Sequence, residues 1–111
     1  MASVLFTFVE TLRFTREVQR ILTDDEYTKL QWRLIEFPHA GDVIPGSGGL
    51  RKIRFSAKGK GTRGGARVIY YFAVSRDRIF MLDIYPKNEK SDLDAAQLKQ
   101  VAEIVKEWLI E

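Results

Sequence analysis

Three segments in the second half of the chain alternate between two kinds of side chain with the period of a β-strand. They span Leu50 to Ser56, Ala66 to Val74 and Arg78 to Tyr85, and they are rich in β-branched and aromatic residues. A loop rich in Gly, Lys and Arg separates the first two segments, and a short turn at Ser75-Arg76-Asp77 separates the last two. The segments are therefore predicted to form an antiparallel meander.

The alternation predicts one apolar and one basic face for this sheet, because every second side chain of a strand points to the same side. The residues predicted on the apolar face are Ile53, Phe55, Val68, Tyr70, Phe72, Val74, Phe80, Leu82 and Ile84. The residues predicted on the opposite face are Lys52, Arg54, Arg67, Tyr71, Asp83 and Tyr85, with Lys87 just beyond the last strand. The apolar face would pack against helices, and the basic face would suit a phosphodiester.

Two helical patterns precede the meander and would supply the layer that covers its apolar face. The apolar residues that recur at helical spacing are Phe14, Val18, Ile21 and Leu22, followed by Tyr27, Leu30, Leu34 and Phe37. Thr23 and Glu26 form a capping-box pattern at the start of the second helix, and Pro38 marks its end. These residues predict a helical hairpin.

The remaining segments complete the order of elements. Residues Val4 to Val9 are predicted to form a first strand that pairs centrally in the sheet, and the Gly-rich residues 41–49 an irregular loop. Ser91 and Asp94 form a second capping-box pattern, and apolar positions from Leu98 to Leu109 line one face of a closing helix. The expected fold is a single α+β domain over residues 1–111, in the order βααβββα, with an antiparallel sheet of about four strands.

The charge of the chain is concentrated rather than evenly mixed. The net charge is only +3, yet no acidic residue lies between Asp42 and Asp77. That stretch holds eight of the 18 basic residues, namely Arg51, Lys52, Arg54, Lys58, Lys60, Arg63, Arg67 and Arg76. A local positive field of this kind indicates an anion-binding surface.

Composition restricts the chemistry that such a surface could perform. With no cysteine and one histidine, the chain cannot form disulfides or thiolate zinc sites, so catalysis would use Lys, Arg, Tyr, Asp or Glu. We expect no metal and no cofactor, and His39 is expected at the surface.

No apolar run approaches the roughly 18 residues that cross a bilayer, and the first residues lack the basic stretch of a secretory signal. A cytoplasmic protein with no membrane contact is therefore expected.

Three stretches resemble the HigB-like branch of the RelE/ParE toxin superfamily. They are residues 41–54 (GDVIPGSGGLRKIR), 58–72 (KGKGTRGGARVIYYF) and 85–93 (YPKNEKSDL). The resemblance implies the toxin of a type II toxin–antitoxin system, an endoribonuclease that cleaves mRNA in the ribosomal A site and so inhibits translation. It also implies a cognate antitoxin, expected to be HigA-like with a helix-turn-helix domain, through which the pair would contact operator DNA.

The resemblance also implies which residues form the site. The basic pair of the family on the second strand falls on Lys52 and Arg54, and its arginine at the start of the third strand falls on Arg67. A basic residue after the last strand falls on Lys87, near Tyr85. The tyrosine that the family places shortly afterwards has no counterpart, because Asp94 stands at the matching position. The candidate catalytic residues are Lys52, Arg54, Arg67, Lys87 and Tyr85.

Cleavage by these residues would be metal-independent. The arginines would stabilise charge on the phosphate, and a lysine would donate a proton or orient the ribose 2′-hydroxyl. The general base is left open among Tyr85, Glu89 and a lysine. The predicted contacts to ribosomal RNA are Lys58, Lys60 and Arg63, and Tyr71 would either stack on a base or pack against Ile69 or the last helix.

Three other functions are compatible with the sequence. A ParE-like toxin would bind DNA gyrase and cut no RNA, and a non-catalytic module would block the ribosome by occupying the A site. A degenerate toxin would be folded but inactive, an alternative that the missing tyrosine leaves open. The Gly-rich loop lacks the Walker phosphate-binding pattern, which argues against nucleotide hydrolysis. The combination of Lys52, Arg54 and Arg67 favours the nuclease.

Overall fold

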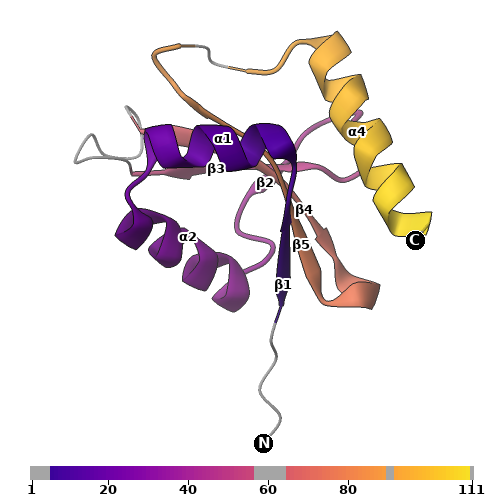
Figure 1. The fold of residues 1–111 in the computed structure, drawn as a ribbon. Coiled ribbons are helices and arrows are strands. Elements are labelled where there is room, and N and C mark those ends of the chain that lie inside the picture. Colours follow the sequence, from indigo (N-terminus) through magenta and orange to yellow (C-terminus); the bar gives the residue numbers. More distant parts are fainter. Residues whose placement is uncertain (1–5, 57–64, 90–91, 111) are drawn as a thin grey trace, which may run out of the picture.

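The computed structural model describes residues 6–56, 65–89 and 92–110 of the chain. They form an α+β fold with the predicted succession of a strand, a helical hairpin, a meander and a closing helix (Figure 1). In chain order the elements are β1 (Thr7–Glu10), α1 (Leu12–Ile21), α2 (Asp24–Glu36), β2 (Asp42–Val43), β3 (Arg51–Phe55), β4 (Ala66–Ala73), the 3₁₀ helix η1 (Val74–Arg76), β5 (Arg78–Pro86) and α4 (Ala95–Ile110). The predicted fold class is confirmed, with β2 as an addition to the predicted order.

The strands form one mixed sheet in the order β1-β5-β4-β3-β2. Neighbouring strands run antiparallel except β1 and β5, which pair in parallel. The expectation that the first strand pairs centrally is wrong, because β1 lies at an edge of the sheet. The reason is that β5 ends the meander with one open edge, which β1 occupies, and no later strand in the described chain covers β1.

The Gly-rich segment that was predicted as an irregular loop contains the short strand β2, which pairs with the start of β3. Gly48 and Gly49 adopt φ angles of 76° and 104°, a conformation that favours glycine. They let the chain turn back between β2 and β3, where the Ile44 N–H donates a hydrogen bond to the Leu50 carbonyl at 2.8 Å. The described sheet therefore has five strands, one more than expected.

Side-chain caps determine where the hairpin helices begin. The Thr11 hydroxyl accepts a hydrogen bond from the Phe14 N–H at 3.0 Å and donates one to the Leu82 carbonyl at 2.8 Å, which ties α1 to β5. At the start of α2, the Thr23 hydroxyl accepts from the Glu26 N–H at 3.1 Å, and the Glu26 carboxylate accepts from the Thr23 N–H at 2.8 Å. The second arrangement is the predicted capping box.

The closing helix begins at a different capping box from the predicted one. The Asp94 carboxylate accepts a hydrogen bond from the Gln97 N–H at 2.8 Å, and the Gln97 amide oxygen accepts one from the Asp94 N–H at 2.9 Å. Ser91, the first member of the predicted box, lies outside the described residues. Asp94 is therefore the N-cap of α4 rather than the fourth residue of the box.

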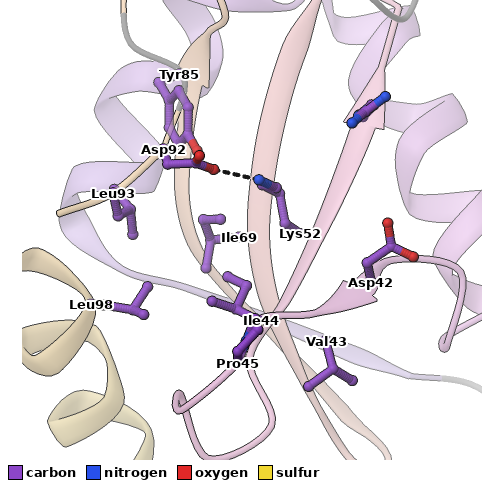
Figure 2. Close-up of a pocket in the computed structure, with 11 residues that line it drawn as sticks. Asp42, Val43, Ile44, Pro45, Lys52, Ile69, Tyr85, Asp92, Leu93 and Leu98 are labelled. Atoms are coloured by element: carbon purple, nitrogen blue, oxygen red, sulfur yellow. Dashed lines mark hydrogen bonds and ion pairs between the residues drawn. The ribbon is translucent and has the colours of Figure 1, made fainter. Parts of the chain in front are cut away.

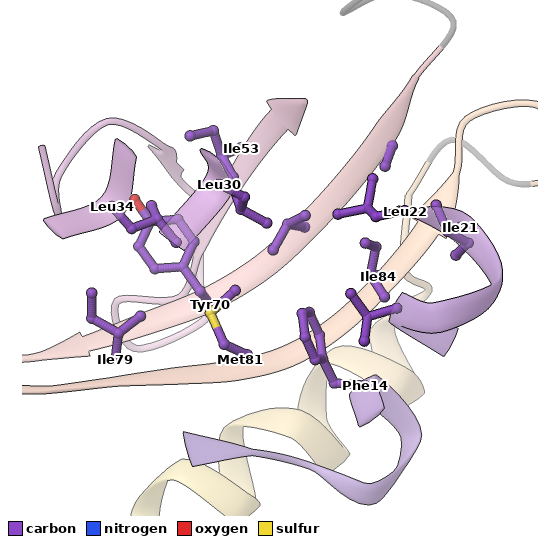
Figure 3. Close-up of a cluster of buried hydrophobic side chains, with 13 residues drawn as sticks. Phe14, Ile21, Leu22, Leu30, Leu34, Ile53, Tyr70, Ile79, Met81 and Ile84 are labelled. Atoms are coloured by element: carbon purple, nitrogen blue, oxygen red, sulfur yellow. The ribbon is translucent and has the colours of Figure 1, made fainter. Parts of the chain in front are cut away.

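The helical hairpin covers one face of the sheet and forms the larger of two apolar clusters with it (Figure 3). The buried members of this cluster are Phe14, Val18, Ile21, Leu22, Leu30, Leu34, Ile53, Ala66, Val68, Tyr70, Ile79, Met81 and Ile84. The predicted packing of the hairpin on the apolar face is thus confirmed for β3 and β4.

Helix α4 covers much of the opposite face, which the alternation predicted to be basic. The buried residues of this second cluster are Leu50, Ile69, Ala73, Phe80, Leu82, Tyr85 and Val105. The face is therefore apolar under α4, and its basic side chains lie beside the start of that helix, at the cavity described below. Period-two counting within a strand could not predict this cover, because it does not indicate which helix packs on which face of the sheet.

The prediction that Phe80 and Leu82 lie on the hairpin face is wrong. Both residues belong to the cluster under α4, whereas Ile79 and Met81 belong to the hairpin cluster. The register between β4 and β5 shifts at this level, so that β5 has one extra residue there. An extra residue moves the side chains on its far side to the opposite face of the sheet. Counting every second residue from Ile84 towards the start of β5 therefore assigns Leu82 and Phe80 to the wrong face.

The predicted turn between the last two strands is the 3₁₀ helix η1, which is followed by Asp77 in a left-handed conformation with a φ angle of 50°. Val74 begins this helix and is exposed. Its predicted place on the hairpin face is therefore wrong, because β4 ends one residue earlier.

The hydroxyl of Tyr70 allows a test of how the hairpin core is held. It accepts a hydrogen bond from the Gly41 N–H at 2.9 Å and donates one to the Pro38 carbonyl at 2.8 Å. Tyr70→Phe would remove the partner of both backbone groups, so we expect the free energy of unfolding to fall by about 2 kcal/mol. Denaturant unfolding would measure the loss. Tyr71→Phe is the control, and equal stability of the two variants would contradict the role of this hydroxyl.

Candidate functional site

A cavity of about 450 Å³ opens where strands β2 to β5 meet the segment that leads into α4 (Figure 2). The residues that line it are Asp42, Val43, Ile44, Pro45, Lys52, Arg54, Ile69, Tyr85, Asp92, Leu93 and Leu98. The lining combines cations, carboxylates and a phenol with apolar side chains. A concave surface with a few convergent polar groups is the usual form of a ligand site.

The strand register places three of the predicted catalytic residues in one row across the sheet. Arg54 on β3 lies directly opposite Arg67 on β4, and Arg67 lies directly opposite Tyr85 on β5. Residues in such positions share a face, with Cβ atoms roughly 5 Å apart. Lys52 lies two residues before Arg54 on β3 and so points to the same side. The structure therefore brings these four residues together.

The two arginines of the row differ in exposure. Arg67 is buried, with 4% of its surface exposed, whereas Arg54 is exposed and lines the cavity. The Arg67 Nη1 group donates a hydrogen bond to the Ala66 carbonyl at 3.4 Å. Its positive charge also acts on the hydroxyl of Tyr85 and favours the ionised phenol. Because the surroundings of Arg67 are poor in water, its attraction to an anion that reaches it is stronger than at the surface.

Two carboxylates that sequence analysis missed also line the cavity. Asp92, from the segment before α4, forms an ion pair with the ammonium group of Lys52 (Figure 2). Asp42 lies on β2 opposite Lys52 in the register. The only sequence signals were their positions, since Asp42 precedes the acid-free basic stretch and Asp92 follows Tyr85 and Lys87 closely. Neither signal indicates which strand the carboxylate approaches.

The phenol of Tyr85 is buried, with 3% of the residue exposed. Burial raises the pKa of Tyr85 to about 12, and the negative charges of Asp92 and Asp83 add to this rise while Arg67 opposes it. Tyr85 is therefore protonated at neutral pH and can donate a hydrogen bond. This protonation argues against Tyr85 as the general base, one of the candidates that the sequence left open.

Glu89 and Lys87 lie outside the cavity lining. The Glu89 carboxylate oxygens accept hydrogen bonds from Nη1 and Nη2 of Arg20 on α1, at 3.0 and 3.2 Å. These bonds direct the carboxylate towards α1, which argues against Glu89 as the base. Lys87 is exposed just beyond β5, and its backbone N–H donates to the Gly65 carbonyl at 3.0 Å.

The predicted RNA contacts lie elsewhere. Tyr71 stacks on Phe80 with ring centroids 6.1 Å apart, within the cluster under α4. Of the two roles that the sequence left open for Tyr71, the structure favours packing. Lys58, Lys60 and Arg63 lie outside the described residues, so their contact with RNA stays a prediction.

The described ranges contain no group of three or more His, Asp or Glu side chains that could hold a metal ion. No helix within them is both long and apolar enough to span a membrane. His39 is exposed, as predicted, and lies edge-on to Phe72 with ring centroids 5.3 Å apart.

Comparison with known proteins finds relatives in sequence and in fold. The family described as the RelE toxin of the RelE/RelB toxin–antitoxin system matches residues 40–110, a range that includes every residue lining the cavity. The fold is similar to a chain of the intact E. coli RelBE toxin–antitoxin complex, with a TM-score of 0.58 and 15% identity over 74% of this chain and 96% of that chain. It is also similar to the isolated E. coli RelE toxin, with a TM-score of 0.58 and 14% identity over 90% of this chain and 99% of that chain.

The titration of Tyr85 provides a measurable signature of the cavity. Its pKa of about 12 exceeds the ordinary value of 10, so Tyr85 should stay protonated where an exposed tyrosine ionises. The folded state then binds this proton more tightly than the unfolded state, so the stabilisation is present below pH 10 and is lost as the pH rises through 12. The difference in phenolate absorbance between the wild type and Tyr85→Phe would give the titration curve. A midpoint near 10 would contradict the burial of this hydroxyl.

Proposed function

Because the chain belongs to the RelE toxin family of toxin–antitoxin systems, we propose that its cavity cleaves mRNA in the ribosomal A site without the help of a metal ion. Membership of the family confirms the predicted class, a RelE-type endoribonuclease toxin. The finer assignment to the HigB-like branch is part of the proposal. The observation that carries the proposal is the row of Arg54, Arg67 and Tyr85 with Lys52 beside it.

The two arginines would stabilise the charge that develops during cleavage. Attack of a ribose 2′-hydroxyl on the adjacent phosphorus builds negative charge on the non-bridging phosphate oxygens. Arg54 and Arg67 lie opposite each other on neighbouring strands, so their guanidinium groups can bind oxygens of one phosphate. Because the side chains are held by the sheet, little reorganisation is needed when the charge appears.

The departing 5′-oxygen needs a proton, and Tyr85 is the group that we assign to donate it. Tyr85 is protonated at neutral pH and lies next to Arg67 in the row, close to where the phosphate would bind. We assign to Lys52 the orientation of the ribose, because its ammonium group lies in the same cavity. Lys87, which is exposed beyond the cavity, would contact the RNA on its way to the site.

The proposed function includes partners. The E. coli RelBE structure is that of a toxin–antitoxin complex, and we extend this arrangement to a cognate, HigA-like antitoxin of this chain. Its helix-turn-helix domain would connect the pair to operator DNA. The other partners are the ribosome and its mRNA, so the toxin would act in the cytoplasm. Each phosphate contact of the basic stretch would make ribosome binding weaken as salt increases.

Removing the guanidinium group of Arg54 or of Arg67 tests whether these arginines stabilise the negative charge on the phosphate during cleavage. Arg54→Ala and Arg67→Ala should each slow single-turnover cleavage of ribosome-bound mRNA by a hundredfold or more, about 3 kcal/mol, because each loses a donor to the transition state. Mapping of new 5′ ends over time would measure the rate. Arg16→Ala is the matched control, since Arg16 is exposed on α1 and its removal changes the net charge equally.

Arg67 is buried, so its variant also needs a comparison that separates folding from chemistry. Arg67→Lys keeps the charge but loses the planar pair of donors, and we expect it to fold while cleaving more slowly than the wild type. A wild-type rate in Arg67→Ala would refute the assignment. If the wild type left no new 5′ ends and replication stopped before translation, the ParE-like alternative would be favoured instead.

The chemistry of the cut ends tests whether the ribose 2′-hydroxyl is the nucleophile, as the proposed metal-independent mechanism requires. Attack by the 2′-hydroxyl leaves a 2′,3′-cyclic phosphate on the upstream fragment and a 5′-hydroxyl on the downstream fragment, whereas attack by metal-activated water leaves no cyclic phosphate. We expect downstream fragments that a polynucleotide kinase labels directly. Fragments that need a phosphatase before labelling would contradict the proposed mechanism.

A further inference from the structure

The proposed reaction still needs a group that takes the proton of the 2′-hydroxyl. Tyr85 is held protonated, and the Glu89 carboxylate is bound to Arg20 on α1. Among the described residues, the carboxylates that line the cavity are those of Asp42 and Asp92. The choice of a carboxylate base therefore lies between these two.

Asp92 is the carboxylate that faces the catalytic side chains. It forms the ion pair with Lys52, and Figure 2 shows its carboxylate beside the hydroxyl of Tyr85. Its charge raises the pKa of Tyr85, an effect that requires the two groups to be close. Because 66% of the Asp92 side chain is exposed, a substrate that enters from solvent can reach it.

Asp42 also lines the cavity and lies opposite Lys52 in the register, but it stands on the edge strand β2. The pKa of Tyr70, whose ring belongs to the hairpin cluster, is raised chiefly by burial, and the charge of Asp42 adds to this rise. In Figure 2 its carboxylate is apart from the pair formed by Lys52 and Asp92. Asp42 is therefore less well placed to serve a ribose bound at the row.

Contacts on the C-terminal side hold Asp92 at the cavity. The next residue, Leu93, packs against the cluster under α4. Asp94 caps α4 through its hydrogen bonds with Gln97. The carboxylate of Asp92 is thus presented next to an anchored helix start, which is the preorganisation that proton transfer needs.

We propose that Asp92 is the general base of this nuclease, an inference that rests on the RNA cleavage proposed above. The Asp92 carboxylate takes the proton of the 2′-hydroxyl while the 2′-oxygen forms a bond to phosphorus. The bond between phosphorus and the 5′-oxygen breaks, and that oxygen takes the proton of Tyr85. The products are a 2′,3′-cyclic phosphate and a 5′-hydroxyl, and proton exchange with water restores Asp92 and Tyr85.

The same ion pair is compatible with one other role. A carboxylate bound to Lys52 could stand in for the substrate phosphate and block the cavity until RNA displaces it. The two roles predict opposite effects of removing the charge, because loss of a base slows cleavage and loss of a blocking group accelerates it.

Single-turnover cleavage of ribosome-bound mRNA by the wild type, Asp92→Asn, Asp92→Glu and Glu89→Gln separates these roles. Asp92→Asn should cleave roughly a hundredfold to ten-thousandfold more slowly while its ribosome binding and thermal unfolding stay unchanged. Asp92→Glu keeps a carboxylate and should recover part of the rate. Glu89→Gln is the matched control and should cleave at the wild-type rate, because that carboxylate is directed to Arg20.

A substrate with sulfur in place of the 5′-bridging oxygen sharpens the assignment. A thiolate leaves without protonation, so this substrate should restore the rate of Tyr85→Phe but not that of Asp92→Asn. Restoration in Asp92→Asn would place Asp92 at the leaving group and would overturn the proposal.

The remaining outcomes separate this inference from the proposed function. A wild type that leaves no new 5′ ends would overturn both. If the wild type cleaves and Asp92→Asn cleaves at the same rate or faster, the role of Asp92 as the base is overturned while the proposed function stands. A faster rate would identify the Asp92 carboxylate as a blocking group. If Asp92→Asn lost ribosome binding in parallel with cleavage, the role of Asp92 as the base would also be overturned, because Asp92 would then act in binding.

Discussion

The register shift between β4 and β5 is the constraint on which the cavity depends. The extra residue in β5 changes which of its side chains face each apolar cluster, with Ile79, Met81 and Ile84 on the hairpin side and Phe80, Leu82 and Tyr85 on the side of α4. In a regular strand Met81 and Tyr85 would point to the same side, because they are four residues apart. Either Met81 would then leave the hairpin core or Tyr85 would leave the row beside Arg67. The bulge therefore lets β5 place Met81 in the hairpin core while Tyr85 stays beside the arginines.

The buried charges near the cavity show how the fold balances stability against binding. Asp83 is 3% exposed, and its carboxylate accepts hydrogen bonds from Nε of Arg13 at 3.0 Å and from the Ile84 N–H at 2.8 Å. Arg67 is 4% exposed and lies in the row that borders the cavity, so its positive charge stands close to where a phosphate would bind. Removing a guanidinium group from water destabilises the folded protein unless a partner compensates. In the proposed function, a phosphate bound at the row would offset part of the cost of burying this charge.

Local rules predicted the features that depend on neighbouring residues. The capping box of Thr23 and Glu26 was predictable because both members lie in one turn, and the shared face of Lys52 and Arg54 because both lie on one strand. The same counting failed for β5, because the bulge arises from pairing with β4. It also failed for the face under α4, since no strand pattern indicates which helix will cover it. The edge position of β1 likewise depends on the order in which the meander fills the sheet.

Asp92 illustrates the same limit at the level of chemistry. It is 40 residues from Lys52 in sequence, and the two meet because α4 packs on the sheet and brings its preceding segment to the cavity. A site built from cations alone attracts phosphate strongly, but its side chains cannot accept a proton while they stay charged. The acid-free stretch that creates the positive field therefore needs a carboxylate from another element. In the proposed mechanism, the docking of α4 supplies that carboxylate, and it thereby converts an anion-binding surface into a site that can move a proton.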